Sequence, residues 1–360
     1  MSARADRADR LIERLGEAGV DVMLVTNLVN VRYLTGYTGT NGLALVGPET
    51  KTFITDFRYV EQAAEEVDAS FERRRAPQDL LEAIGEALPR RSLRLGFEDS
   101  HVTVRTHARL RELLADGVEL VPVNGSIERL RAIKDPREVE RIRAACQLAD
   151  AALEQLLADG LVGRTEREVA LALESTMREM GAQRPSFETI IAAGPHGALP
   201  HAQPRDVVIQ PGQLVVIDWG AELDGYCSDC TRTVATGELD DHAREIYALV
   251  RSAQLAGLEG VAPGRGGREV DAVARAVIER AGHGEHYGHG LGHGVGLEVH
   301  EAPRLSQRSE DELEPGNVVS VEPGVYLPGD VGVRIEDLVV VTERGAEILT
   351  SVPKDLRIVE

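Results

Sequence analysis

Alternating apolar and polar positions in the first third of the chain predict strands and helices in turn. Short apolar runs typical of strands occupy 21–26, 42–46, 51–55, 93–98 and 118–123. Between these runs, "RYVEQAAEEV" and "RTHARLRELLADG" carry apolar residues at helical spacing. This alternation favours an α/β domain, which we expect at residues 1–125.

The pattern changes near residue 125, where long helical periodicities begin. In "SIERLRAIKDPREVERIRAACQLADAALEQLLADG" apolar residues recur every three or four positions, and Asp135 followed by proline predicts the start of a long helix. Thr165, with Glu168 three residues later, predicts the capped start of a second helix.

From Phe187 onward, β-type runs dominate the chain. Two more helices, predicted at 241–260 and 267–281, interrupt them. Helices followed by many short strands and turns favour an α+β domain with antiparallel hairpins, which we expect over residues 126–360.

The first hairpin of interest is "VVIDWGAELDGYCSDCTRTV". Asp224-Gly225 is a strong signal for a two-residue turn. With the turn there, Asp218 lies opposite Thr231, and Asp218 and Asp229 share one face of the hairpin as diagonal neighbours. Two acids are therefore expected to lean toward a common point.

A second hairpin, "SVEPGVYLPGDVGVRIED", brings two more acids together. A three-residue turn at 328–330 places Glu322 opposite Glu336, and like charges opposed in this way destabilise a strand pair. Arg334 shares the face of Glu336 and can pair with one of the acids. Asp218 and Glu322 end apolar runs that normally lie inside a protein, so a solvated strand face explains them poorly. Neighbouring buried acids indicate a metal or a shared proton.

Histidines are concentrated on the glycine-rich stretch "GHGLGHGVGLEVHE", and five of the ten in the chain lie between His283 and His300. One neutral imidazole, at His293, would complete an oxygen-rich set of five ligands for two divalent cations. Such a set favours manganese, cobalt or iron, and zinc is possible. The remaining histidines suggest contacts to substrate. The stretch lacks the strand–glycine–helix order of a phosphate-binding loop.

Composition narrows the classes of function. The formal charge of −20 disfavours nucleic acid and anionic membrane surfaces as partners. The charged amino terminus does not resemble a signal peptide, and no apolar run has membrane-spanning length. Three cysteines suit a reducing compartment, so we expect the cytoplasm. Cys227 and Cys230 point to opposite faces of the first hairpin, which favours structural roles over a shared redox or zinc site.

Four separated motifs carry a resemblance to a known family. In chain order, "IDWGAELDGYCSDCTRT", "GHGVGLEVHE", "SVEPGVY" and "VRIED" resemble the pita-bread metallopeptidases of the Xaa-Pro branch, which contains aminopeptidase P and prolidase. The preceding region resembles the creatinase-type amino-terminal domain through "NVRYLTGYTGTNGLALV". The resemblance implies an α+β pita-bread catalytic domain preceded by a smaller α/β domain.

The resemblance also implies roles for individual residues. His201 and His300 would contact the substrate and stabilise developing charge, and His289 would line the pocket. Arg334 would support the metal site, and Glu322 would carry a proton to the leaving nitrogen. The implied metal ligands are Asp218, Asp229, His293, Glu322 and Glu336.

The implied activity is hydrolysis, assisted by two divalent ions and most simply manganese, of the bond between an amino-terminal residue and proline in small peptides. The enzyme would be an aminopeptidase or a dipeptidase, and a homodimer. A methionine aminopeptidase is the nearest alternative, and the added amino-terminal domain and Arg334 argue against it. A non-catalytic binding module of the same fold is a further alternative. Such relatives typically lack some of the metal-binding residues, whereas this sequence has all five.

Overall fold

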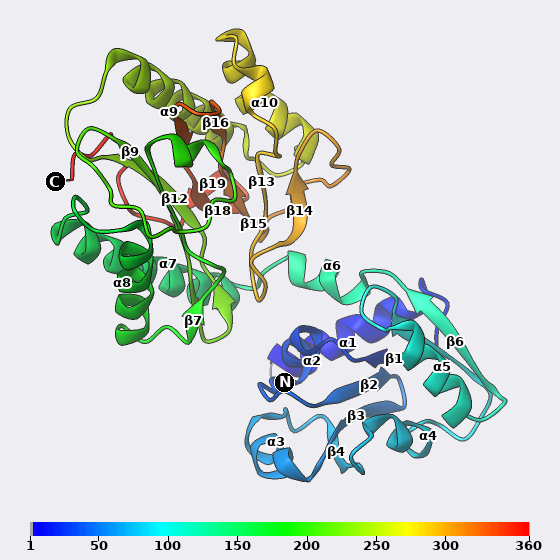
Figure 1. The fold of residues 1–360 in the computed structure, drawn as a ribbon. Helices are drawn as coiled ribbons and strands as arrows, with labels where there is room; N and C mark the ends of the chain where they lie inside the picture. Colours follow the sequence, from blue (N-terminus) through cyan, green and yellow to red (C-terminus); the bar gives the residue numbers. More distant parts are fainter. Residues whose placement is uncertain (1–2, 360) are drawn as a thin grey trace. The chain divides into compact units, whose positions relative to one another are not determined.

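The computed structural model describes residues 3–359. The chain forms two compact units, Met1–Arg131 and Ala132–Glu360 (Figure 1). Each unit has its own buried apolar core.

The amino-terminal unit is built on a six-stranded mixed sheet with the order β4-β3-β2-β1-β5-β6. β1 pairs antiparallel with β2 and parallel with β5, so the sheet contains both kinds of ladder. The strands are β1 (Val22–Val25), β2 (Leu43–Gly47), β3 (Thr50–Thr55), β4 (Glu72–Arg75), β5 (Leu93–Glu98) and β6 (Val118–Val123). Five of the six were predicted; β4, with the sequence "ERRR", has no apolar pattern because it is a largely exposed strand at the end of the sheet.

Short helices connect the strands of this sheet, and some of them pack against it. Leu110 and Ile84 from two of them pack with Leu24 and Leu95 of the sheet in one apolar cluster. The helices are α1 (Ala3–Leu15), α2 (Leu28–Thr35), α3 (Val60–Glu66), α4 (Ile84–Ala87), α5 (Val104–Leu113) and α6 (Ser126–Ala132), with 3-10 turns η1 (Phe57–Tyr59) and η2 (Leu80–Ala83). The predicted α/β character is confirmed.

Four long helices belong to the second unit, and their predicted starts are confirmed. Capping boxes form at Asp135 with Glu138 and at Thr165 with Glu168, where each pair satisfies free backbone N–H groups of the first turn. The helices are α7 (Pro136–Ala158), α8 (Glu166–Glu179), α9 (Asp241–Gly260) and α10 (Gly267–Arg280).

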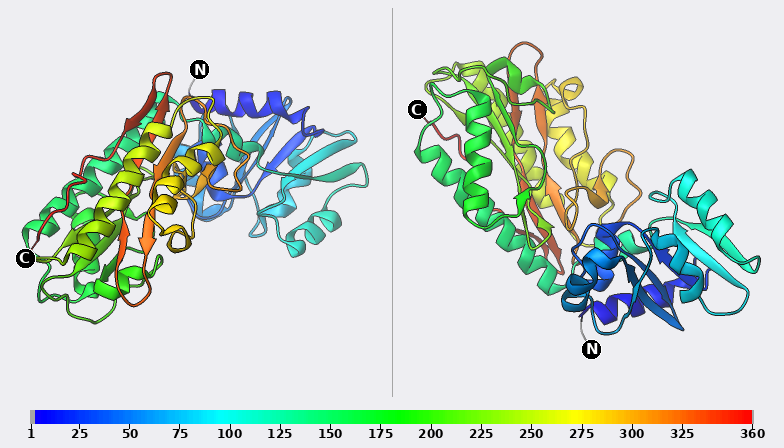
Figure 2. Two further views of the ribbon diagram at one scale, coloured as in Figure 1. Left: turned by 90° about the horizontal axis from the view of Figure 1, so that it is seen from above. Right: turned by 60° about the horizontal axis from the view of Figure 1, so that its bottom comes forward.

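The strands of the second unit lie between the two helix pairs. In the right-hand view of Figure 2, α7 and α8 (green) lie on one side of the strands and α9 and α10 (yellow) on the other. The strands are β7 (Arg184–Pro185), β8 (Ile190–Ala193), β9 (Leu214–Trp219), β10 (Ala221–Leu223), β11 (Tyr226–Cys227), β12 (Cys230–Ala235), β13 (Gly292–Gly294), β14 (Glu301–Leu305), β15 (Val318–Val321), β16 (Gly324–Tyr326), β17 (Gly332–Arg334), β18 (Asp337–Thr342) and β19 (Gly345–Ile348), with 3-10 turns η3 (Gly194–Ala198) and η4 (Gly284–His286).

These strands form two helix-backed sheets and two smaller ones. The sheet β12-β9-β8 buries Ile217 against Leu153 of α7, and the sheet β14-β13-β15-β18-β19 buries Val319 against Val250 of α9. The smaller sheets are β11-β10-β7 and the hairpin β16-β17. The faces of the two larger sheets that point away from the helices are free to build a site.

The first predicted hairpin forms with the expected register. Asp224 and Gly225 take φ values of 50° and 79°, as a two-residue turn with two left-handed positions requires. Asp218 pairs with Thr231 across β9 and β12. Asp218 and Asp229 are therefore neighbours, as predicted.

The second hairpin has the predicted register but an unpredicted break. Val321 pairs with Asp337 in one ladder and Gly324 with Arg334 in the next, so Glu322 and Glu336 fall between two ladders. Glu322 and Glu336 are therefore opposite in register, as predicted, but neither ladder includes them. The break in the ladder falls at the point where the two like charges are opposed.

Candidate metal and catalytic site

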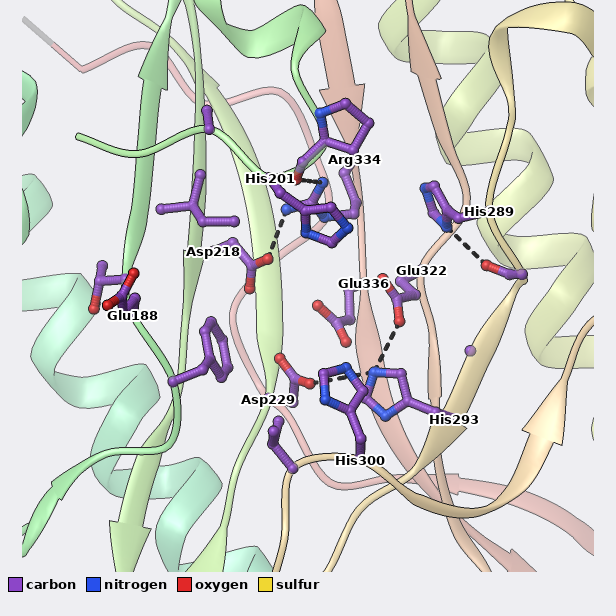
Figure 3. Close-up of a pocket in the computed structure, with 18 of the residues that line it drawn as sticks. Glu188, His201, Asp218, Asp229, His289, His293, His300, Glu322, Arg334 and Glu336 are labelled. Atoms are coloured by element: carbon purple, nitrogen blue, oxygen red, sulfur yellow. Dashed lines mark hydrogen bonds and ion pairs between the residues drawn. The ribbon is translucent and has the colours of Figure 1, made fainter. Parts of the chain in front are cut away.

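Three acids from separate segments of the chain meet in the second unit. Carboxylate oxygens of Asp218, Asp229 and Glu336 all lie within 4.8 Å of one another (Figure 3). The exposed fraction is 4% for Asp229 and 1% for Glu336. Asp218 lies within the core strand β9, and Asp229 and Glu336 directly precede β12 and β18, so the backbone of buried strands fixes all three.

Glu322 and His293 complete the cluster from the neighbouring sheet. His293 Nε2 lies 3.1 Å from Glu322 Oε1 and 3.7 Å from Asp229 Oδ2. The Ser320 hydroxyl donates a hydrogen bond of 3.0 Å to Glu322 Oε1. One imidazole therefore faces an acidic cluster built by two sheets.

The backbones at the break of the second hairpin are held by other strands. The N–H of Glu322 donates to the carbonyl of Leu291 at 2.8 Å, and that of Glu336 donates to the carbonyl of Thr231 at 3.0 Å. The two glutamates therefore bind backbone groups close in sequence to His293 and Asp229 instead of each other.

The cluster leaves oxygen atoms without protein partners. Among the described residues, Asp218 Oδ1 and Glu336 Oε1 are buried and accept no hydrogen bond, which is costly for a carboxylate. Four carboxylates and an imidazole are donors suited to divalent manganese, cobalt, iron or zinc. The arrangement fits a metal centre.

The charges of the cluster respond to burial and to one another. Burial, reinforced by the neighbouring carboxylates, raises the pKa of Asp229 and Glu336 well above the ordinary range. At Glu322, burial favours the protonated acid, but the hydrogen bond and charge of His293 outweigh it and lower the pKa to about 2. Positive charge in the cluster would favour the ionised form of every acid.

Arg334 is the cation that the protein itself supplies to this cluster. Its Nη2 donates to Asp218 Oδ2 at 2.6 Å, and its Nε donates to the Thr231 hydroxyl at 3.1 Å. That hydroxyl donates in turn to Glu336 Oε2 at 2.7 Å. Arg334 thus orients two acids, one directly and one through Thr231, which the register of β9 and β12 places opposite Asp218.

Two histidines have fixed neighbours in the wall of the site. The rings of His300 and His293 lie 4.2 Å apart between centroids. His289 Nε2 lies 2.9 Å from the hydroxyl of Tyr326, and that hydroxyl also accepts from Arg334 Nη1 at 2.9 Å. Burial lowers the pKa of His289, and burial together with His293 lowers that of His300 to about 4, so both are neutral near pH 7.

His201 enters the same space from the loop after η3. The carbonyl of its neighbour Pro200 accepts a hydrogen bond of 3.1 Å from Arg334 Nη1, which holds this loop against the cluster. Figure 3 shows the His201 ring in front of Arg334, facing the acids.

A single cavity of about 480 Å³ collects all nine residues that the sequence singled out. They are His201, Asp218, Asp229, His289, His293, His300, Glu322, Arg334 and Glu336. Residues that the sequence analysis did not single out also line it: the apolar Phe187, Ile190 and Val299, and the exposed Arg304. No local pattern distinguishes Arg304 in "EAPRL" from other exposed strand residues.

The cysteine pair plays no part in this cavity. Cys227 packs in an apolar cluster with Val295, whereas Cys230 packs in a different one with Trp219. Both thiols are free, and burial raises the pKa of Cys227 to about 12. The prediction that they do not share a site is confirmed.

Comparison with known proteins identifies the family. Residues 140–343 match the family model described as metallopeptidase family M24, and residues 7–133 match the creatinase/prolidase N-terminal domain. The chain belongs to metallopeptidase family M24. Membership of this family implies a divalent metal, for which the carboxylate cluster is suited.

Relatives of this M24 chain match it over almost its whole length. An uncharacterized peptidase of Bacillus subtilis is 44% identical over 97% of the chain and 99% of that protein. The solved Xaa-Pro dipeptidase from Bacillus anthracis is 42% identical, covers 99% of this chain and all of that one, and superposes with a TM-score of 0.96. The X-Pro aminopeptidase from Thermotoga maritima is 36% identical, with coverage of 98% and 100% and a TM-score of 0.91. The fold expected from the resemblance is confirmed.

Within the part of the chain that the structure describes, no helix combines the length and apolar character needed to cross a bilayer.

Proposed function

We propose that this enzyme hydrolyses the peptide bond between an amino-terminal residue and proline, with two divalent ions, most simply manganese, held by the acidic cluster. The observation that carries the proposal is the buried cluster with orphaned carboxylate oxygens, in one cavity with three further histidines. The names of the two solved relatives support the Xaa-Pro specificity. The proposed ligands are Asp218, Asp229, His293, Glu322 and Glu336.

Divalent ions bound there would supply Lewis acidity, which polarises the scissile carbonyl and lowers the pKa of a water molecule. The protein's own side chains would transfer the proton and bind the substrate. Glu322 is ionised and lies at the edge of the cluster beside His293, so we assign it the transfer of a proton from the attacking water to the proline nitrogen.

The histidines outside the ligand set are proposed to bind the substrate. His300 is neutral and can donate one ring N–H to the carbonyl oxygen as negative charge develops there, and His201 can do the same from the opposite loop. His289 would position the substrate from the wall. Arg334 would keep Asp218 ionised and oriented.

Arg304 gives a reason to include dipeptides among the substrates. It lines the cavity, and within residues 3–359 its guanidinium makes no hydrogen bond or ion pair. A free carboxylate on the proline of an Xaa-Pro dipeptide is the natural partner for such a group. We propose that Arg304 binds this carboxylate.

The test is a substrate series with manganese present: Ala-Pro, Ala-Pro-Ala, a longer Xaa-Pro peptide and Met-Ala. We expect cleavage of Ala-Pro and little of Met-Ala. Faster cleavage of Met-Ala would replace the proposal with a methionine aminopeptidase. Failure to cleave any of the four by protein that binds manganese would favour a binding module. The relative rates on the first three peptides decide between dipeptidase and aminopeptidase.

A further inference from the structure

The glycine-rich segment that carries His289 needs contacts from other parts of the protein to hold it in one conformation. Between the end of α10 and β13, glycine stands at every second position from Gly288 to Gly292. Glycine-rich backbone has high conformational entropy when free, so other groups must hold His289 in the cavity wall.

A buried ion pair on α10 lies against this stretch. Asp271 and Arg275 are one helical turn apart and form two short contacts, Nε to Oδ2 at 2.8 Å and Nη2 to Oδ1 at 2.9 Å. The side chains are 1% and 9% exposed. A pair this deeply buried is rarely explained by stability alone, because apolar residues of similar volume would serve as well.

Both members of the pair also bind the backbone of the stretch. Arg275 donates to the carbonyl of Tyr287 at 2.9 Å and to that of His289 at 2.7 Å, while Asp271 accepts from the N–H of Leu291 at 3.0 Å. The guanidinium carbon lies 4.2 Å from the centroid of the Tyr287 ring. Three alternate residues are thus fixed along one side of an extended run.

The fixed residues lead directly to the site. The His289 ring is oriented by Tyr326, whose hydroxyl accepts from Arg334, and the carbonyl of Leu291 accepts the N–H of Glu322. A shift of the stretch would therefore displace a pocket histidine and the backbone of a proposed ligand together.

We propose that Asp271 and Arg275 are positioning residues, which hold the 287–291 backbone so that His289 and Glu322 are aligned for the reaction. Neither residue touches the cavity. The catalytic consequence rests on the proposed function, whereas the ordering of the backbone does not.

The test compares two conservative substitutions in ion pairs of equal spacing. Arg275→Lys keeps the charge but cannot reproduce the forked contacts. The matched control is Arg265→Lys, since Arg265 pairs with Glu269 four residues on, at 3.1 Å and largely exposed. Hydrogen exchange of the metal-free protein is followed on a peptide covering 282–292, and kcat, KM and manganese affinity are measured with Ala-Pro.

We expect Arg275→Lys to accelerate exchange in that peptide and to lower kcat by about tenfold or more, because misplacement of catalytic groups by an ångström is costly. Manganese affinity should also fall, because the backbone of the proposed ligand Glu322 is bonded to Leu291, so kcat is measured at saturating manganese. KM should stay within about threefold, and the control should match the parent enzyme. Unchanged exchange in Arg275→Lys would overturn the proposal. Faster exchange with an unchanged kcat on Ala-Pro would overturn its catalytic half.

A double variant, Asp271→Leu with Arg275→Met, removes both charges together. No unpaired charge is then left buried, so the variant is expected to fold. The positioning role predicts a folded protein with a low kcat and fast exchange in the 282–292 peptide. A double variant with parental kcat and exchange would show that the pair only fills space. If the parent protein cleaves no Xaa-Pro peptide but the exchange results hold, the proposed function fails and the ordering role stands.

Discussion

At the scale of the residue, the site depends on buried side chains that bind several partners at once. Arg334 shows this most clearly, because its guanidinium binds Asp218, Thr231, Tyr326 and the carbonyl of Pro200. A buried cation with fewer partners would be expensive, and lysine could not satisfy this geometry. One planar group therefore links the acids, the His201 loop and the wall of the cavity.

His293 and His300 lie side by side, but replacing each by alanine should have different effects on metal content and activity. His293→Ala removes a proposed ligand, so manganese content should fall together with activity. His300→Ala removes only a donor to the substrate, so kcat should fall by about a hundredfold or more with manganese content near that of the parent. Metal analysis of both variants after dialysis, beside kcat for Ala-Pro, separates the roles. Equal loss of metal in the two variants would show that they are assigned wrongly.

Arg304→Met tests recognition of the free carboxylate. A charge-assisted contact of about 1.5–3 kcal/mol corresponds to a rise in KM for Ala-Pro of about 10- to 150-fold, with little change in kcat. Ala-Pro amide, which lacks the carboxylate, should show no such rise. Arg308→Met, at an exposed position outside the cavity, is the control. A similar change with both substrates would remove Arg304 from carboxylate binding.

At the scale of the element, the strands must approach closely enough to bring their side chains together. A Cβ on Gly292 of β13 would lie 1.9 Å from the carbonyl oxygen of Ser320 on β15. Any larger residue there must push apart the two strands that carry His293 and precede Glu322. The glycine pattern of this stretch therefore has a packing role, at least at this position.

Gly292→Ala should destabilise the metal-free protein by about 1–3 kcal/mol and weaken manganese binding, since the added methyl group overpacks the sheet. Gly288→Ala is the matched control, because a Cβ there meets nothing within 4 Å and its φ is not left-handed. Its effect should be within about 0.5 kcal/mol. Urea unfolding of both variants makes the comparison, and equal stability would contradict the packing role.

Much of this element-scale structure could be predicted, because local signals specify it. The Asp224-Gly225 turn sets the register that places Asp218 opposite Thr231. The break at Glu322 was not predictable from the hairpin alone, since it arises from hydrogen bonds to strands elsewhere in the sequence. The Asp271 pair on α10 and the exposed Arg304 were missed for the same reason. The partners of the pair are backbone groups outside the helix, and the proposed partner of Arg304 is a substrate.

At the scale of the catalytic unit, the site joins two layers that have separate cores. One sheet, packed on α7, provides Asp218, and the other, packed on α9, provides His293 and the strand before Glu322. The acids repel one another across this junction. Metal binding should therefore stabilise the fold as well as supply chemistry.

Manganese at about 100 times its dissociation constant should add about 2.7 kcal/mol per site to the free energy of unfolding. For a domain of this size, each occupied site then corresponds to a rise in Tm of about 5–10 °C. Asp229→Asn should abolish most of the rise, and Glu310→Gln, at an exposed position, should retain it. Calorimetry with and without manganese measures this, and an equal rise in Asp229→Asn would place the stabilising ions elsewhere.

The most direct test of the metal-dependent mechanism is the rate of Ala-Pro hydrolysis as chelated protein is titrated with manganese. The account predicts no activity in the metal-free protein and a rise that saturates at about two equivalents of bound manganese. Full activity in protein shown by metal analysis to be free of divalent ions would contradict it.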